Sequence, residues 1–149
     1  MSRAPGGARR VGRLIGIDPG ERRIGVAVGD EETGMAFPRP ALRAGARAPD
    51  GVRALADAEG TQRIIVGLPL NMDGSEGPQA AAARAFGARL GALGLDVIFS
   101  DERLTTWDAA ERIARSGSRS TAADAIDSAA AAVILEQYFA DRRRRPEGT

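Results

Sequence analysis

Short apolar runs separated by polar turns dominate the first third of the chain. The runs Leu14–Ile17 and Ile24–Val28 flank a turn that contains Pro19 and Gly20, a pattern typical of two strands joined by a tight connection. A third run follows, and its two prolines favour the edge of a sheet because proline cannot donate a hydrogen bond to a neighbouring strand. The pattern predicts strands over residues 13–18, 23–29 and 35–42, paired antiparallel.

The rest of the chain alternates between helical and strand patterns. The predicted elements are a helix over 50–58 stopped by Gly60, a strand over 63–68, a helix from Pro78 to Gly91 or Gly94, a strand over 96–100, a helix from Thr105 or Thr106 to Ser116, and a helix over 123–142. This alternation implies parallel crossovers. We therefore predict an α/β fold: a five-stranded mixed sheet, with an antiparallel meander plus two parallel strands, and helices on both faces.

The composition of the 149 residues fits one globular domain, which we place at residues 13–141. The segment 1–12 is rich in Arg, Gly and Pro and has no apolar stretch, so we expect a disordered leader rather than a signal peptide. Residues 142–149 form a basic tail. No run approaches the length of a membrane span, so we expect a cytoplasmic protein without a membrane partner.

The chain has neither Cys nor His. This excludes disulfides, thiolate nucleophiles, Cys-based zinc sites and acid–base catalysis by His. A metal would have to be bound through oxygen, which suits Mg²⁺ or Mn²⁺. The net charge of +1 indicates no particular partner, although all 21 basic residues are Arg, the residue best suited to bidentate phosphate contacts.

The block Arg142–Arg145 at the end of the last predicted helix has two interpretations. Cations suit the negative end of a helix dipole, so the block can be a solvated helix terminus. It can also contact the phosphate backbone of a nucleic acid.

Acidic residues stand where apolar elements begin or end. Asp18 follows the first strand, Glu102 follows the last, and Asp127 lies in the first turns of the last helix, three residues after Asp124. A buried carboxylate without a partner is unfavourable, and a shared divalent cation would remove that penalty. Taken singly, each residue also fits a turn or a helix cap, because Asp and Glu favour those positions.

The loop Val66–Gly77 is the second feature that could carry chemistry. Its four glycine and proline positions shape the backbone, and Asn71 and Asp73 are among its polar residues. The helix that begins near Pro78 offers free backbone N–H groups to an anion. A capped loop without a ligand explains the same residues.

Four motifs together resemble one family. The segments LIGIDPGERRIGVAVGD, VGLPLNMDGSEGP, SDERLTT and AIDSAAAAVILEQY occur in this order between Leu14 and Tyr138. They resemble the YqgF/RuvX family, whose members are described as Holliday junction resolvases or as pre-16S rRNA nucleases. The likeness extends over about Leu14–Asp141, and GLPLNMDG followed by DERLT is its most specific part.

The resemblance implies a ribonuclease H-like fold related to that of the resolvase RuvC. It further implies that Asp18, Glu102 and Asp127 are catalytic carboxylates that bind metal. The expected cofactor is two Mg²⁺ or Mn²⁺ ions. Substrate contacts would come from Arg103, from Asn71 and Asp73 in the loop, and from Arg23 in the first motif.

The segment before the last helix departs from the family pattern. Members often carry several basic residues there, whereas residues 118–124 of this chain contain only Arg119. Asp124 is not the usual family residue either. It resembles the paired aspartates at the equivalent helix of RuvC and is a candidate fourth metal ligand, or else an acid at the helix start.

We therefore expect a metal-dependent endonuclease acting on structured nucleic acid, with precursor 16S rRNA ahead of a Holliday junction. Two other hypotheses stay open. One is an actin-like or sugar-kinase-like phosphotransferase, which would need a second lobe and a longer chain. The other is an RNA-binding module without catalysis. The protein is expected to be a monomer or a homodimer, and cutting a junction symmetrically would require the dimer.

Overall fold

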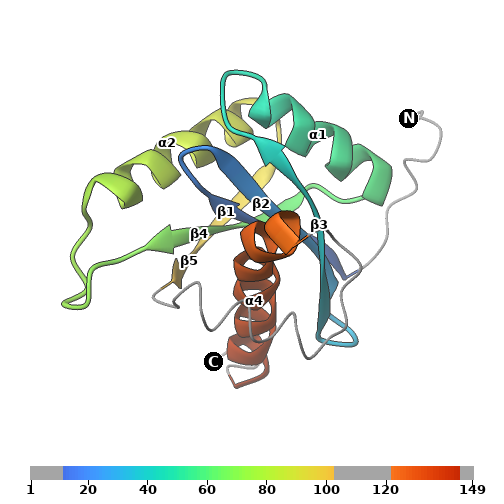
Figure 1. Ribbon diagram of the computed structural model, residues 1–149. Helices are drawn as coiled ribbons and strands as arrows, with labels where there is room; N and C mark the ends of the chain where they lie inside the picture. Colours follow the sequence, from blue (N-terminus) through green and yellow to red (C-terminus); the bar gives the residue numbers. More distant parts are fainter. Residues whose placement is uncertain (1–11, 103–121, 145–149) are drawn as a thin grey trace.

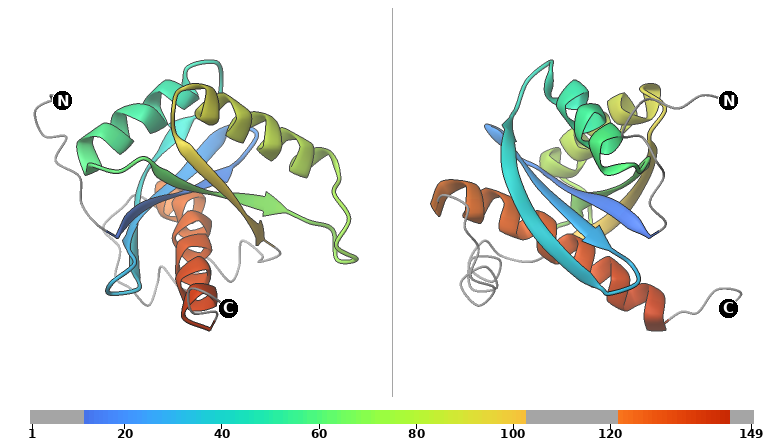
Figure 2. Two further views of the ribbon diagram at one scale, coloured as in Figure 1. Left: turned by 180° about the vertical axis from the view of Figure 1, so that it is seen from behind. Right: turned by 90° about the vertical axis from the view of Figure 1, so that its right-hand side faces the viewer.

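A central sheet with helices on both faces forms the protein. The computed structural model describes residues 12–102 and 122–144, apart from the side chains of residues 102, 122–127 and 144. Helices α1 (Ala48–Glu59) and α2 (Pro78–Ala92) cover one face of the sheet, and α4 (Ala122–Arg144) covers the other (Figures 1 and 2). No helix in these ranges is both long and apolar enough to cross a membrane.

The strands are β1 (Arg13–Pro19), β2 (Arg23–Asp30), β3 (Met35–Arg43), β4 (Arg63–Pro69) and β5 (Asp96–Glu102). All five were predicted from the apolar runs, and each extends one or two residues further than its run. Helix α1 begins before its predicted start because Pro49 fits the first turn. It ends as predicted at Gly60, which has a left-handed φ of 71°. The predicted helix ending at Ser116 lies outside the described residues.

The strand order is β3-β2-β1-β4-β5. The first three strands pair antiparallel, whereas β4 runs parallel to both β1 and β5. The predicted mixed sheet is confirmed, and so is the edge position of the proline-containing β3. Because three parallel strands lie side by side, their carboxyl ends share one edge of the sheet.

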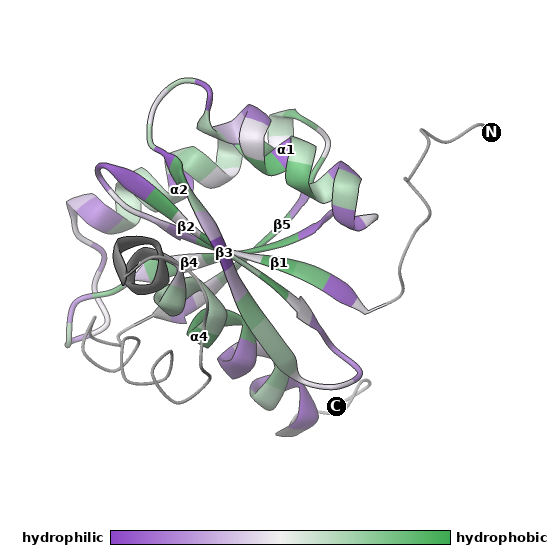
Figure 3. Cartoon of the chain, turned by 45° about the vertical axis from the view of Figure 1, so that its right-hand side comes forward, coloured by the Kyte–Doolittle hydropathy of each residue, from purple (hydrophilic) through white to green (hydrophobic). Residues whose placement is uncertain are grey.

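Apolar side chains are buried on both faces of the sheet. The hydropathy colouring of Figure 3 shows hydrophobic residues along the central strands. On β1, Ile15 and Ile17 pack with residues of α1 and α2, whereas Leu14 packs with residues of α4. A strand that is covered on both faces of the sheet has no side chains exposed to solvent. This is why β1 and β4 read as nearly continuous apolar runs in the sequence.

Glycines in the sheet let α4 approach closely. A Cβ at Gly16 would lie 2.6 Å from Cγ of Leu135 and 2.7 Å from the carbonyl oxygen of Ala131. A Cβ at Gly67 would lie 2.5 Å from Cδ1 of Ile134. Any side chain at these two positions would force the helix away from β1 and β4.

Candidate functional site

Two of the predicted acidic positions lie at the carboxyl edge of the parallel strands. Asp18 is the penultimate residue of β1, and Glu102 is the last residue of β5. Strand β4 separates them, with Pro69 in register with Glu102. In open α/β sheets, this edge is where ligands bind.

Helix α4 brings its first turns toward the same edge. Phe139 packs near Gly29, in the part of β2 that lies beside the start of β1. Ser128, eleven residues earlier by number, accepts a hydrogen bond of 3.2 Å from the backbone N–H of Val26, closer to the β1–β2 turn. Tracing the helix backward therefore leads toward the carboxyl end of β1, and Asp127 comes just before Ser128.

Ser128 fixes this start of α4 against the sheet. Its hydroxyl group, fully buried, accepts from Val26 and donates to the carbonyl oxygen of Arg39 at 2.6 Å. One side chain thus satisfies backbone groups of both β2 and β3. The backbone position of Asp127 is held by this contact.

The pleat of the strands puts these positions on one side of the sheet. In β1, Leu14 and Gly16 face α4. Because alternate residues of a strand share a face, position 18 belongs to the face covered by α4 as well. In β5, Ile98 packs against the core residues of α4. Position 102 is four residues further along the strand and therefore belongs to the same face. The Asp18 side chain is half-buried and takes part in a polar or ionic interaction.

The remaining predicted ligands and contacts are only partly described. Asp124 and Asp127 lie in α4, but their side chains and that of Glu102 are outside the described part, and Arg103 is outside it entirely. Among the described side chains, no three acidic groups come close enough to hold a metal ion. The assignment of Asp18, Glu102 and Asp127 as ligands therefore stays a prediction.

A cleft of about 470 Å³ begins at Asp18 and extends along α2, on the face of the sheet opposite α4. Its lining includes Gly20 and Glu21 from the β1–β2 turn, and Phe86 and Arg89 from α2. Arg89 also donates a hydrogen bond to the carbonyl oxygen of Ala46 at 2.9 Å. The cleft gives a ligand access to the carboxyl end of β1.

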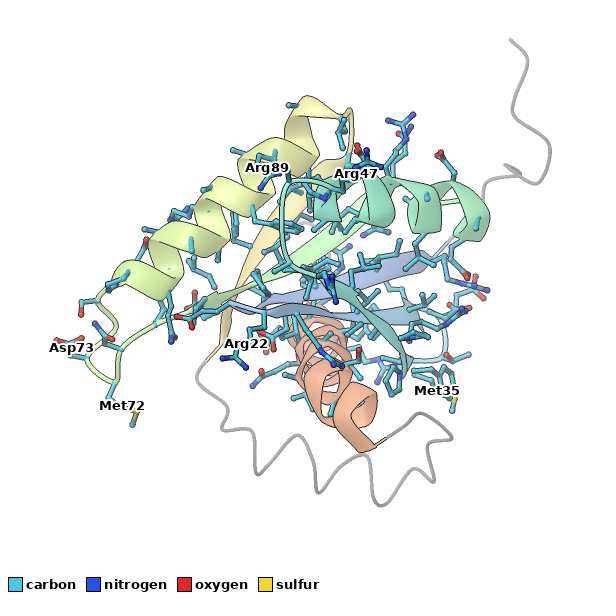
Figure 4. All side chains as sticks on the ribbon, turned by 45° about the horizontal axis from the view of Figure 1, so that its top comes forward. Arg22, Met35, Arg47, Met72, Asp73 and Arg89 are labelled. Atoms are coloured by element: carbon cyan, nitrogen blue, oxygen red, sulfur yellow. The ribbon has the colours of Figure 1, made fainter. Side chains whose placement is uncertain are left out.

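The loop between β4 and α2 is held together by its own polar groups. Asn71 donates from Nδ2 to the Ser75 hydroxyl at 2.9 Å, and that hydroxyl donates to Oδ1 of Asp73 at 2.6 Å. These contacts shape the loop that carries Met72, whose exposed fraction is 86% (Figure 4). The roles of Asn71 and Asp73 as substrate contacts stay predictions.

An ion pair ties this loop to α2. Arg84 donates to both carboxylate oxygens of Glu76, from Nε at 2.8 Å and from Nη2 at 2.6 Å. The hydrogen bond from Arg84 lowers the pKa of the Glu76 carboxyl below its ordinary value. The loop is thereby anchored at the end that leads into the helix.

Arginines surround a second depression next to the cleft, and sequence reasoning singled out only one of them. Arg23, whose role as a substrate contact stays a prediction, begins β2 and is exposed. Arg22 and Arg43 line the same depression. The signal for Arg43 was weak because its proximity depends on the register between β2 and β3, which the sequence does not show.

The opposite edge of the sheet, where β1 and β4 begin, carries matched charges. Glu59, only 8% exposed, accepts from Arg13 at 2.5 Å and from Arg39 at 2.9 Å. In the β2–β3 turn, Glu31 pairs with Arg63 at 3.3 Å and with Arg142 at 2.6 Å. Arg142 belongs to the predicted basic tail, and in the structure it continues α4 and contacts the body of the domain.

The chain is similar in sequence to a known protein family. A family model described as RuvX, Holliday junction resolvase, matches residues 12–141. A protein of Escherichia coli strain SE11 named as a pre-16S rRNA nuclease is 45% identical over 132 residues, covering 86% of this chain and 96% of the relative. A protein of the same name from Colwellia psychrerythraea is 44% identical over 142 residues, covering 93% and 94%.

Among solved structures, RuvC of Thermus thermophilus in complex with a Holliday junction substrate has a similar fold. The TM-score is 0.58 at 15% sequence identity, and the match covers 89% of this chain and 96% of the RuvC chain. A second RuvC structure from the same organism gives a TM-score of 0.54. The predicted ribonuclease H-like fold is confirmed.

Proposed function

Because the chain belongs to the RuvX family of Holliday junction resolvases, we propose that it is a hydrolytic nuclease that cleaves phosphodiester bonds in structured nucleic acid. The relatives named as pre-16S rRNA nucleases are similar over nearly their whole length. We therefore propose precursor 16S rRNA as the substrate, processed in the cytoplasm.

One observation supports this proposal most strongly. The positions of Asp18, Glu102 and Asp127 come from three separate elements, yet β1, β5 and α4 bring all three toward one edge and one face of the sheet. Three acidic positions that converge from distant parts of a chain are typical of a metal-dependent hydrolytic site. Caps and turns alone would not require them to meet.

Oxygen donors suit Mg²⁺ or Mn²⁺, and the chain has no His or Cys that would favour another metal. We propose that Asp18, Glu102 and Asp127 would hold two such ions. When bound, the ions would activate water and stabilise the leaving oxygen of a phosphodiester. The half-buried position of Asp18 at a strand end fits this role, because burial of a carboxylate favours a cationic partner.

The other predicted residues would hold the substrate. Arg103 directly follows the Glu102 position and would bind a phosphate oxygen. Arg23 is exposed at the start of β2, beside the same edge. Asn71 and Asp73 would contact the substrate from the β4–α2 loop, and Asp124 would be a fourth ligand or a helix-start acid.

A Holliday junction is the second candidate substrate. The family description and the fold shared with RuvC favour it. Resolution of a junction requires two symmetric cuts and therefore a homodimer, whereas processing of an RNA end needs only a monomer. The oligomeric state thus helps to separate the two substrates.

The test is cleavage of precursor 16S rRNA and of a four-way DNA junction, side by side, with Mg²⁺ and with Mn²⁺. We expect cleavage of the RNA that stops when EDTA is added. Cleavage of the junction alone would reverse the order of the two substrates. Binding without cleavage of either substrate under any metal condition would support a non-catalytic RNA-binding module instead.

A further inference from the structure

Three arginines gather around a depression on the surface beside Asp18. Its volume is about 470 Å³, and it is lined by Arg22 and Arg23 from the β1–β2 connection and by Arg43 from the end of β3, with Glu21, Ala41 and Ala44. All three arginines are exposed. Glu21 is the one acidic residue in this lining, so the depression carries a net positive charge.

The register of the sheet puts two of these arginines opposite each other. Arg23 and Arg43 are directly opposite each other in the antiparallel pair of β2 and β3. Like charges directly opposite each other destabilise a sheet. Within the described residues, the side chains of Arg22 and Arg43 make no ion pair or hydrogen bond with an acidic group. An arrangement that disfavours the free fold is explained if an anion binds there.

The depression adjoins the cleft at Asp18. Glu21 and Ala44 line both of them. Asp18 is in register with Gly25, so Arg23 lies two residues along the neighbouring strand, at the diagonal position where long side chains still reach each other. A chain molecule whose scissile group is near Asp18 can therefore extend directly over the arginines.

We propose that Arg22 and Arg43 form a phosphodiester-binding subsite that holds the backbone of the nucleic acid beside the catalytic edge, with Arg23 between them and Asp18. This inference rests on the proposed function. Guanidinium groups bind phosphate oxygens in bidentate fashion and do so without reading the base sequence. The subsite sets the direction of the substrate: from Asp18 across the β1–β2 turn toward the end of β3.

The experiment measures binding of a four-way DNA junction and of a precursor 16S rRNA fragment in EDTA, where cleavage is suppressed, over a range of salt concentrations. The test variant is Arg22→Gln/Arg43→Gln. The control is Arg47→Gln/Arg53→Gln, which changes the net charge equally at two exposed positions at and near the start of α1. For duplex arms, each lost phosphate contact lowers the slope of log affinity against log salt by about 0.9.

We expect the slope to fall by about two units in the test variant and to stay at the wild-type value in the control. The single variant Arg43→Gln removes the opposed charge, so its melting temperature should equal or exceed that of wild type while its affinity falls. A merely structural role for Arg43 would lower both. Equal slopes in the test and control variants would overturn the subsite, as would a wild-type protein that binds neither substrate.

Wild-type cleavage with Mg²⁺ and Mn²⁺ is measured in the same preparation, which separates the two proposals. Cleavage by wild type together with an unchanged slope in the test variant refutes the subsite and leaves the nuclease intact. A reduced slope in a protein that never cleaves supports the subsite and refutes the nuclease.

Discussion

The two edges of the sheet use charge in opposite ways. Where β1 and β4 begin, Glu59 and Glu31 are each paired with two arginines. Where the parallel strands end, acidic positions converge from three elements, and Arg22 and Arg43 gather without an acidic partner among the described residues. The first edge pairs both of these acids with arginines, whereas the second holds two arginines that have no acidic partner in the described part of the chain.

The difference separates structural from functional charge. Matched pairs contribute to folding and leave little capacity to bind anything else. Like charges held together are unfavourable in the free protein, and they gather at sites where a ligand of opposite sign binds. Substitutions at the two edges should therefore have opposite consequences for stability and activity.

The largest effect is expected at the start of α4. Asp127→Ala should abolish cleavage at nearly unchanged melting temperature, because it removes a proposed metal ligand. Asp124→Ala should keep most of the activity and lower stability by about 0.5 kcal/mol, because Asp124 lies in the first turn of α4, where an acid favours the helix dipole. Cleavage assays and thermal melting on both variants provide the check. Equal inactivity of the two at equal stability would make Asp124 a fourth ligand.

At the matched edge, Glu59→Ala should act mainly on folding. It removes the buried carboxylate shared by Arg13 and Arg39 and leaves the partly buried Arg13 without its charge partner. We expect a loss of about 3 kcal/mol in the free energy of unfolding, measured by urea denaturation. Cleavage per folded molecule should stay unchanged. A variant with normal stability and reduced activity would contradict the division between the edges.

Ser128→Ala tests the contact that holds the start of α4 to the sheet. It leaves the backbone N–H of Val26 and the carbonyl of Arg39 without their buried partner. The expected loss is about 2 kcal/mol. Ser75→Ala, at an exposed hydroxyl in the β4–α2 loop, is the matched control and should change stability by less than about 0.5 kcal/mol. Similar losses in the two variants would argue against this role of Ser128.

The smallest effect concerns the ion pair between Glu76 and Arg84. Because the pKa of Glu76 is lowered in the folded protein, its ionised form stabilises the fold above the ordinary value of 4.5, and this contribution is lost as the pH falls through the lowered pKa. The melting temperatures of wild type and Glu76→Gln should therefore differ slightly at pH 7 and converge as the pH falls below the ordinary value of 4.5. A difference that grows on acidification would contradict the assigned direction.

The strands and helices were largely predictable because periodicity reports local structure. Apolar runs identified β1, β4 and β5, and Gly60 and Pro78 marked helix boundaries that the structure confirms. The exact ends were less predictable. Proline in a first turn extended α1 backward, and strand pairing at the sheet edges lengthened the strands.

Features that depend on packing were not predictable from one sequence. In α4, the consecutive residues Val133, Ile134 and Leu135 are all buried, so no single helical stripe in the sequence marks the packed face. The glycines that admit α4 and the contacts of Ser128 join residues far apart in the chain. The pairing of Arg142 with Glu31 likewise joins the end of α4 to the β2–β3 turn, and neither sequence interpretation of the basic block, a solvated helix terminus or a phosphate contact, included this ion pair.

The most direct test of the account is a comparison of Asp18→Asn with wild type in metal-dependent cleavage of precursor 16S rRNA, with binding and thermal melting measured on the same samples. We predict that Asp18→Asn cleaves more than about a hundredfold more slowly than wild type. Its binding in EDTA should persist, and its melting temperature should be unchanged or slightly higher. Wild-type rates of cleavage by Asp18→Asn would contradict the assignment of the carboxyl edge as the catalytic site.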